Sequence, residues 1–279
     1  MGPHIFDRSG FAALSDLKTH TWRDIYERLK QAQTEFLARS RDFRSPEYIW
    51  PRDPLRTWSR LWEYPYVYHH LHRLGSDRPK NKPLKVADVG SGVTFFPFAL
   101  SRLGCDVSCV DVDPVCERDL NAAIGVVPHG PGQLCFVRTD GQNLSFEDAS
   151  LDAVYSISVL EHVPNFEQII REIHRVLKPS GRLVLTFDVD YRGDSQLTVE
   201  SFAKAMTVLD DLFEHASPER PVHPKNILHS LNSPYALKTD SLLMALRKAI
   251  VRRLRGRKSP GKHPRHLAIY AACLTPRSK

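Results

Sequence analysis

The sequence predicts an α/β fold with a Rossmann-like, doubly wound and mainly parallel sheet and helices on both faces. Two observations support this prediction: short apolar runs alternate with helical patterns between residues 84 and 190, and the first apolar run leads into a glycine-rich loop. Strands that alternate with crossover helices pair in parallel. The expected strands are residues 85–89, 106–111, 133–138, 153–158 and 182–187, and the expected helices are 96–103, 114–123 and 166–177.

Two further segments flank the core, which we place at residues 81–190. Residues 1–80 have helical and aromatic patterns, and we expect them to form an N-terminal helical cap or lid outside the core, with Thr21 as a helix N-cap. Residues 178–181, Lys-Pro-Ser-Gly, are expected to end the last core helix. The C-terminal part, residues 191–279, is expected to form a substrate-side insertion with helices at 198–213 and 241–254 and a closing strand at 266–274.

The composition is that of an ordinary globular protein, with 42% hydrophobic and 25% charged residues among 279. No stretch approaches the roughly 18 apolar residues that a membrane span needs, and the start lacks the pattern of a secretory signal, so we expect a cytoplasmic protein. The cysteines form no C-x-x-C pair, which favours reduced, buried thiols. They are Cys105, Cys109, Cys116, Cys135 and Cys273.

The formal net charge of +7 belongs to one end of the chain. Eleven Lys and Arg residues and no acid follow residue 240, so residues 1–240 carry a net charge of −4. Three interpretations of the basic segment stay open. It is a solvated helix face, a contact of residues 241–265 with an anionic membrane, or an attraction for an anionic acceptor such as a nucleic acid.

The loop after the first expected strand points to a nucleotide cofactor. Asp88 precedes Gly90 and Gly92, whose lack of side chains lets backbone amides approach a ligand. Asp111 follows Gly92 by 19 residues and ends the next strand, close to the spacing at which a carboxylate binds ribose hydroxyls. Together these features predict an adenosine-containing cofactor.

Two other classes of nucleotide site are disfavoured by what stands in the loop. A dinucleotide fingerprint G-x-G-x-x-G needs a glycine at position 95, where the sequence has Phe95. No G-x-x-x-x-G-K-[ST] segment occurs, so a P-loop is excluded.

The core resembles the class I S-adenosylmethionine-dependent methyltransferases, in particular the broad group that includes many small-molecule and quinone methyltransferases. The resemblance covers residues 84–190 and implies S-adenosylmethionine as cofactor and S-adenosylhomocysteine as product. Four segments carry it in the family's order and spacing: 86–92 (VADVGSG), 110–114 (VDVDP), 138–144 (RTDGQNL) and 151–163 (LDAVYSISVLEHV).

The resemblance also implies a role for individual residues. The glycine loop would face the methionine half of the cofactor, Asp111 would bind ribose, and Asp140 would meet the adenine amino group, with the Gly141 backbone against the ring. The implied cofactor-binding residues are Asp88, Gly90, Ser91, Gly92, Thr94, Asp111, Val112, Asp140, Gly141 and Ser158.

Thr94 is a departure from the family pattern, because it stands where the loop usually has a third glycine. Threonine disfavours positive φ. The loop is therefore expected either to turn differently or to use the Thr94 hydroxyl against the cofactor's carboxylate. A non-catalytic, cofactor-binding protein is the alternative that rests on this position.

Methyl transfer from a sulfonium requires mainly an aligned nucleophile and the exclusion of water, and a base is needed only for a hydroxyl or a protonated amine. His162, after the fourth strand, is the candidate catalytic base, and a packing role at a helix start is its alternative. Glu161 is expected to be structural or cofactor-facing.

Several other polar residues are weaker candidates. Asp188 and Asp190 follow the fifth strand, and a solvated loop is preferred over a metal site. No metal is expected, because His215, His223 and His229 lack ligand spacing. Residues 60–66, RLWEYPY, precede the core, where relatives place a lid; their aromatic rings are expected either to stack on a ligand or to pack ordinarily, and Arg60 to meet a carboxylate.

The acceptor is expected to be a small molecule or a glycan, methylated on oxygen and held by the N-terminal cap and residues 188–235. An RNA or DNA methyltransferase that uses the basic segment is the alternative. Against it, the Asn/Asp-Pro-Pro-Tyr/Phe type of motif found in amino-methylating nucleic-acid enzymes is absent after the fourth strand, where residues 156–159 read Ser-Ile-Ser-Val.

Overall fold

A computed structural model describes residues 4–76, 79, 82–163, 165–190, 197–237 and 266–277. Its central feature is one sheet, in which seven strands follow each other and two short strands attach to them. The path runs β1 (Gly10–Phe11), β9 (Leu267–Pro276), β6 (Leu177–Asp190), β5 (Leu151–Ile157), β2 (Leu84–Val89), β3 (Cys105–Asp111) and β4 (Leu134–Arg138); β7 (Leu197–Thr198) pairs with β6, and β8 (Phe213–His215) pairs with β9.

The strand directions confirm the doubly wound α/β prediction. All neighbours from β4 to β6 pair in parallel, and only β9 runs against its partners β6, β1 and β8. The strand order reverses between β2 and β5, since the chain goes from β2 outward to β4 before it returns to β5. Ligands of such sheets bind beyond the carboxyl ends of the strands at this reversal.

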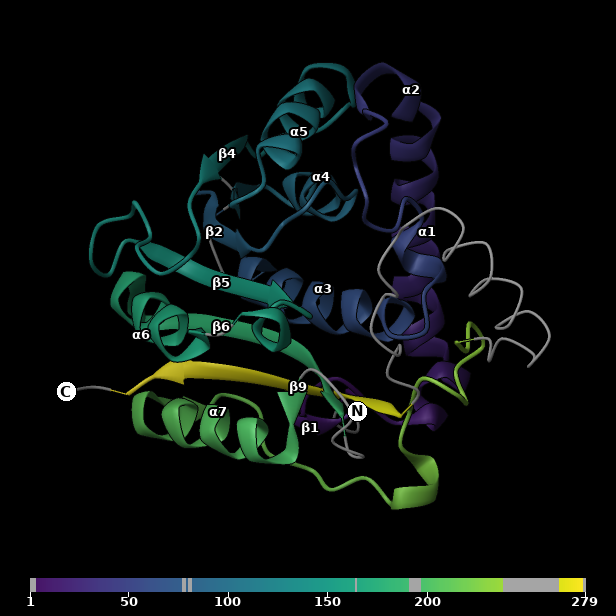
Figure 1. Cartoon of the computed structure of the whole chain (residues 1–279), viewed down its shortest axis with the longest axis vertical. Helices are drawn as coiled ribbons and strands as arrows, with labels where there is room; N and C mark the ends of the chain where they lie inside the picture. Colours follow the sequence, from purple (N-terminus) through teal and green to yellow (C-terminus); the bar gives the residue numbers. More distant parts are fainter. Residues whose placement is uncertain are drawn as a thin grey trace, which may run out of the picture.

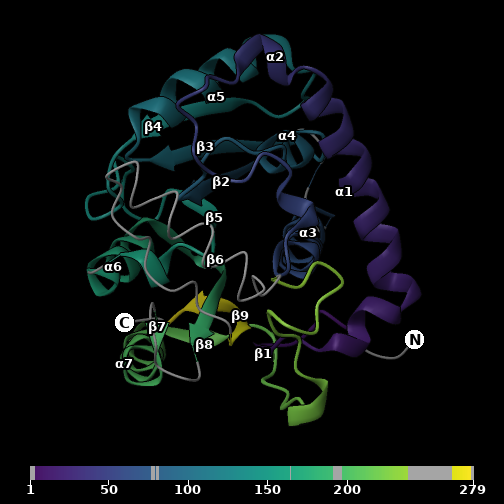
Figure 2. The ribbon, with the colours of Figure 1, turned by 45° about the vertical axis from the view of Figure 1, so that its right-hand side comes forward.

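Helices cover both faces of the sheet (Figures 1 and 2). Alternate residues of each strand point to opposite faces, so Val86 and Val107 belong to one buried cluster and Ala87 and Val110 to the other. The first face carries α1 (His20–Ala38), α2 (Ser40–Phe43), α3 (Arg60–Ser76), α4 (Phe96–Ser101) and α5 (Pro114–Val126), and the second carries α6 (Phe166–Val176) and α7 (Val199–Leu212).

The N-terminal segment is part of the hydrophobic core, so the expectation of a separate cap was wrong. Helix α3 has apolar and aromatic residues on all sides and is therefore buried against the sheet. Trp62, Tyr66 and Val67 are at most 1% exposed. Helix α1 packs behind α3 and α4 through Leu29 and Phe36.

The N-cap prediction for the first long helix was also wrong. Thr19, not Thr21, caps α1, because its Oγ1 accepts a 3.2 Å hydrogen bond from the Trp22 backbone N–H. Thr21 is already the second residue of the helix, so it lies past the N-cap position.

Residues 178–181 do not end the last core helix. Helix α6 ends at Val176, and the strand pairing of β6 starts at Leu177. The pairing then jumps from Leu151–Leu177 to Ala153–Arg182, so residues 178–181 bulge out of the ladder.

Other predictions have mixed outcomes. The closing strand and the helix at 198–213 are confirmed as β9 and α7. Cys135 is exposed, whereas the other four cysteines are buried as expected. The predicted helix at 241–254 lies outside the described residues. Within the described part of the chain, no helix is long and apolar enough to cross a bilayer.

Candidate cofactor and acceptor site

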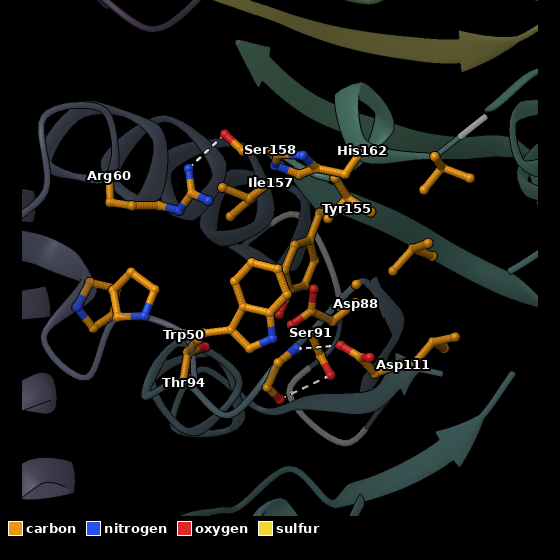
Figure 3. A pocket seen from close by; sticks show the side chains of 18 of the residues that line it. Trp50, Arg60, Asp88, Ser91, Thr94, Asp111, Tyr155, Ile157, Ser158 and His162 are labelled. Carbon is orange, nitrogen blue, oxygen red and sulfur yellow. Dashed lines mark hydrogen bonds between the residues drawn. The ribbon is translucent and has the colours of Figure 1, made fainter. Parts of the chain in front are cut away.

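A cavity of about 660 Å³ lies beyond the carboxyl ends of β2, β3, β5 and β6, where the strand order reverses. Its size is within the range typical of small-molecule and cofactor sites. Every predicted cofactor-binding residue lines it, and so do His162 and Arg60. Figure 3 shows Asp88, Ser91 and Asp111 at one end of this cavity and Arg60, Ser158 and His162 at the other.

The glycine loop is shaped by two residues with positive φ. Gly90 has φ +82°, and a Cβ there would lie 2.3 Å from Cγ2 of Val159. Gly92 has φ +54°, and its N–H donates a 2.9 Å hydrogen bond to Asp111 Oδ2. At Gly90 both the positive φ and the contact with Val159 exclude a side chain, so only glycine fits there.

Thr94 does not adopt the glycine-like conformation of the family loop. Among the described residues, only Ala149 and Ser158 have positive φ without being glycine. The Thr94 hydroxyl oxygen accepts a 3.4 Å hydrogen bond from the Phe96 N–H at the start of α4. The Thr94 backbone therefore carries no positive-φ strain, and Thr94 lines the cavity, so a contact with the cofactor's carboxylate stays a prediction.

The nucleoside end of the cavity has one acid from each of two neighbouring strand ends. Asp111 ends β3 and also accepts a 3.0 Å hydrogen bond from the Asp113 N–H, which fixes its carboxylate. Asp140 follows β4, and Gly141 beside it has φ +80°. Val112 projects into the cavity with 62% of its surface exposed, which leaves an apolar face without a protein partner.

These features fit S-adenosylmethionine. A carboxylate suits ribose hydroxyls, an exposed valine next to it suits the face of an adenine ring, and a second carboxylate suits the exocyclic amino group. The glycine loop itself lines the cavity with Gly90, Ser91 and Gly92, next to these carboxylates. The residues that would hold the cofactor are thus the ones the sequence pattern singled out.

Asp88, at the end of β2, is buried beneath the cavity. Burial raises the pKa of its carboxyl to about 8, and the nearby Asp111 carboxylate adds to the shift. The carboxyl of Asp88 lies beside the buried Tyr155 (Figure 3), whose hydroxyl partly offsets this rise in pKa.

The opposite end of the cavity is a buried polar cluster around Glu63 of α3. Glu63 is 0% exposed and forms an ion pair with Arg60. Its Oε1 accepts hydrogen bonds from the hydroxyls of Ser158, at 2.8 Å, and Thr186, at 2.6 Å. Arg60 in turn donates a 2.6 Å hydrogen bond to the Ser158 oxygen. The carboxylate that Arg60 was predicted to meet is thus that of Glu63 in the same chain.

Glu161 and Asp188 lie next to this cluster, and both side chains are about nine-tenths buried. Asp188 and Asp190 were expected in a solvated loop, which was wrong: β6 continues to Asp190 because β9 pairs with it there, and Asp190 is 1% exposed. Burial raises the pKa of Glu161 to about 7, and it raises the pKa of Asp188 well above its usual range.

His162 is exposed and lines the cavity. Desolvation lowers the pKa of its imidazole, and the positive charge of Arg60 lowers it further. A neutral imidazole at pH 7 is compatible with a base. No group of three or more His, Cys, Asp or Glu side chains within the described ranges is arranged to hold a metal ion.

Three cavity-related residues were missed by the sequence reasoning. Glu63 and Thr186 build the polar cluster, and Trp50 lines the cavity from the loop before α3. The available signal for Glu63 was a single acid within the aromatic segment 60–66, since a buried charge requires a partner. Thr186 and Trp50 had no such signal.

Comparisons with known proteins agree with this site. Residues 87–185 match the family model described as a methyltransferase domain. Over 124 residues, 42% of this chain and 31% of the relative, the chain is 32% identical to the sterol 24-C-methyltransferase erg-4 of Neurospora crassa. Over 200 residues, 64% of this chain and 54% of the relative, it is 28% identical to the mitochondrial ubiquinone biosynthesis O-methyltransferase of Rattus norvegicus. The chain thus spans about a third to a half of the length of these relatives.

One solved structure supports the fold across nearly the whole chain. The [4+2]-cyclase SpnF matches with a TM-score of 0.51 and 16% sequence identity, over 88% of this chain and 94% of that chain. Because that protein is named for a different reaction, the shared fold does not decide the chemistry.

The glycine loop, the acid that ends β3 and their place at the strand reversal define a Rossmann-like domain for an adenosine-containing cofactor. The match to the methyltransferase family model narrows this class of cofactor-binding domain. Residues 87–185 match a methyltransferase domain, and S-adenosylmethionine is the cofactor that this match and the residues of the site support.

Proposed function

We propose that this chain transfers a methyl group from S-adenosylmethionine to a small molecule or glycan held in the same cavity, most simply to one of its oxygen atoms. The observation that carries the proposal is the continuity of the cavity. One wall has the glycine loop, Asp111 and Asp140, and the other has Arg60, Ser158 and Asp188. A donor and an acceptor would therefore meet inside one continuous cavity.

The cofactor, when bound, supplies an electrophilic methyl group on its sulfonium. The residues of this chain then have three tasks. Asp111 and Asp140 fix the nucleoside, and Gly90 and Gly92, with their positive φ, shape the loop that the methionine half would approach. Trp50 and Ile157 line the cavity with apolar surface and help to exclude water, which strengthens electrostatic interactions inside.

The named relatives support an acceptor of small size. One is a sterol methyltransferase and the other is a ubiquinone biosynthesis O-methyltransferase, and they match 42% and 64% of this chain. The proposed acceptor would lie against α3 and β6, both of which contribute residues to the lining of the cavity.

Calorimetry with S-adenosylmethionine and S-adenosylhomocysteine tests the cofactor part of the proposal. Asp111→Ala removes the ribose acid and is expected to weaken both ligands at least tenfold, because a hydrogen bond to a charged group is worth roughly 1.5–3 kcal/mol. Asp106→Ala, at the opposite end of the same strand, is the control and should leave both affinities unchanged. Equal binding by Asp111→Ala and the unchanged chain would refute the assignment.

A nucleic acid remains the competing acceptor because of the eleven basic residues after residue 240. A salt titration of binding to a short RNA distinguishes the two. We expect weak binding with little dependence on salt, whereas a steep fall of affinity with salt would favour the nucleic-acid acceptor.

A further inference from the structure

Two neighbouring buried carboxylates have oxygen atoms without a partner within the described residues: Asp188, which lines the acceptor end of the cavity, and Glu161, which lies next to it outside the lining. Glu161 lies in the short helix Leu160–His162, and its Oε1 accepts a 3.2 Å hydrogen bond from the Asp188 N–H of β6. Glu161 Oε2 and Asp188 Oδ1 are both buried, and within the described residues neither has a hydrogen-bond partner. Asp188 lines the cavity. Buried polar atoms normally find a partner, so these two oxygens call for a ligand.

The charged groups around Glu161 and Asp188 also favour a bound hydrogen-bond donor. Arg60 and Glu63 face the pair from α3, and Arg60 is the positive group among them. Arg60 already pairs with Glu63 and donates to Ser158. Glu161 and Asp188 are thus left without a cation of their own, and two adjacent buried carboxylates cannot both be ionised cheaply. The raised pKa of each carboxyl agrees with a pair that holds a proton.

We propose that Asp188 and Glu161 form a proton-accepting pair whose cavity-lining member, Asp188, faces the position of the transferred methyl group and binds an O–H or N–H group of the acceptor. The inference rests on the proposed function and names the chemistry of its acceptor. A hydrogen-bond donor is the ligand that satisfies two orphaned carboxyl oxygens, whereas an apolar acceptor would leave both unsatisfied.

The chemical step is balanced. The acceptor oxygen or nitrogen forms a bond to the methyl carbon, the carbon–sulfur bond breaks, and its electron pair stays on sulfur. The acceptor's proton passes to Asp188, the member of the pair that lines the cavity. Burial raises the pKa of the adjacent Glu161 to about 7, so the pair can take up or release a proton near the working pH, where proton transfer is most efficient. His162, exposed at the same cavity, is the competing proton acceptor.

The test needs no acceptor. Sinefungin is an analogue of the cofactor that carries a primary ammonium group in place of the methylsulfonium, so it presents N–H donors at the methyl position. Calorimetry compares its affinity with that of S-adenosylhomocysteine, which has nothing there. We expect the unchanged chain to prefer sinefungin, and Asp188→Asn and Glu161→Gln each to reduce this preference about tenfold while the affinity for S-adenosylhomocysteine stays the same.

Two controls separate this pair from its neighbours. Asp140→Asn, at the adenine end, should weaken both ligands alike and keep their ratio. His162→Ala should keep both the preference and its increase between pH 5.5 and pH 8.5, an increase that arises because Glu161 loses its proton as the pH rises through about 7. A pH dependence that disappears in His162→Ala would assign the proton to the histidine and overturn the proposal.

The failure of the pair and the failure of the proposed function give different results. If the Asp188 and Glu161 variants keep the full preference for sinefungin, the pair does not face the methyl position and the inference is wrong, although the cofactor assignment stands. If neither ligand binds the unchanged chain, the proposed function itself fails, and the pair fails with it.

Discussion

The Ser158 hydroxyl donates a 2.8 Å hydrogen bond to Oε1 of Glu63, which joins the end of β5 to a helix that begins almost a hundred residues earlier. Ser158 has a φ of +50°, an unfavourable value for a residue other than glycine. The hydrogen bond and the contact with Arg60 hold the side chain in place. The methyltransferase domain and the N-terminal segment are therefore coupled at the point where the acceptor is expected to bind.

Removal of Glu63 is expected to be severe. Glu63→Ala leaves Arg60 without its carboxylate partner in a buried site, and breaking such a pair costs about 3–5 kcal/mol of unfolding free energy. Glu27→Ala, which breaks the exposed pair with Lys30 on α1, should cost at most about 1 kcal/mol. Urea unfolding measures both. A loss for Glu63→Ala no larger than that for Glu27→Ala would show that the cluster does not stabilise the fold.

Gly90→Ala tests the close approach of the loop. The new Cβ would lie 2.3 Å from Val159 Cγ2, and φ +82° disfavours any side chain, so we expect a loss of stability of at least about 1–3 kcal/mol and a loss of cofactor binding. Gly75→Ala in α3 has nothing within 4 Å of the new Cβ and should be neutral or slightly stabilising. Adding Val159→Ala should recover only part of the loss, since the strain in φ remains.

Val112→Asp separates binding from folding. Val112 is 62% exposed at the cavity, so the change should alter the unfolding free energy by less than about 0.5 kcal/mol. It should nevertheless weaken S-adenosylhomocysteine, because a carboxylate would replace the apolar surface expected under adenine. Val199→Asp, at a valine that is 58% exposed on α7, provides the matched control and should leave calorimetric binding intact. Equal affinities in the two variants would contradict the adenine assignment.

Thr94→Gly restores the residue of the family pattern, yet we expect no gain. The Thr94 backbone is not in the positive-φ region, and its hydroxyl accepts a hydrogen bond at the start of α4. Glycine would lose this bond and add freedom to the unfolded chain, which together should cost about 1 kcal/mol. Denaturant unfolding and cofactor calorimetry check the two effects. Tighter cofactor binding by Thr94→Gly would show that the threonine impairs the loop.

The stability of the fold should depend on pH through Glu161. Burial raises its pKa from the ordinary 4.5 to about 7, so the folded state binds a proton that the unfolded state has lost. The contribution of this carboxyl to stability therefore falls as the pH rises from about 4.5 to 7 and then stays constant. Glu161→Gln should gain about 1–3 kcal/mol at pH 8 and nothing near pH 4.5. Glu214→Gln, at an exposed position of β8, should show no such pH-dependent gain in denaturant unfolding at the two pH values.

The sequence contained enough information for the parallel sheet and for the nucleoside end of the cavity. The strand periods, Gly90 and Asp111 are local signals, because strand, loop and acid follow each other within about 25 residues. The acceptor end of the cavity has no comparable local signal in the sequence. Glu63, Ser158 and Thr186 meet only after three distant elements have packed together. No local pattern indicates which face of α3 reaches the end of β5.

Asp188 is a second residue whose place in the fold could not be predicted from its local sequence. Its neighbours resemble a loop, since acids alternate with other residues after an apolar run. The strand continues because β9 pairs with it as far as Asp190 and Leu267, and β9 lies almost eighty residues further along the chain. Long-range pairing of this kind overrides local propensity.

The position of β9 also has a consequence for biosynthesis. This strand lies between β6 and β1 and pairs with both, so one edge of β6 stays open until residues 267–276 have left the ribosome. The parallel core at residues 84–190 is synthesised earlier and would wait with an unpaired, largely apolar strand edge, a surface that favours aggregation. Slow translation of the segment after β6 should therefore increase the demand of this chain for chaperones.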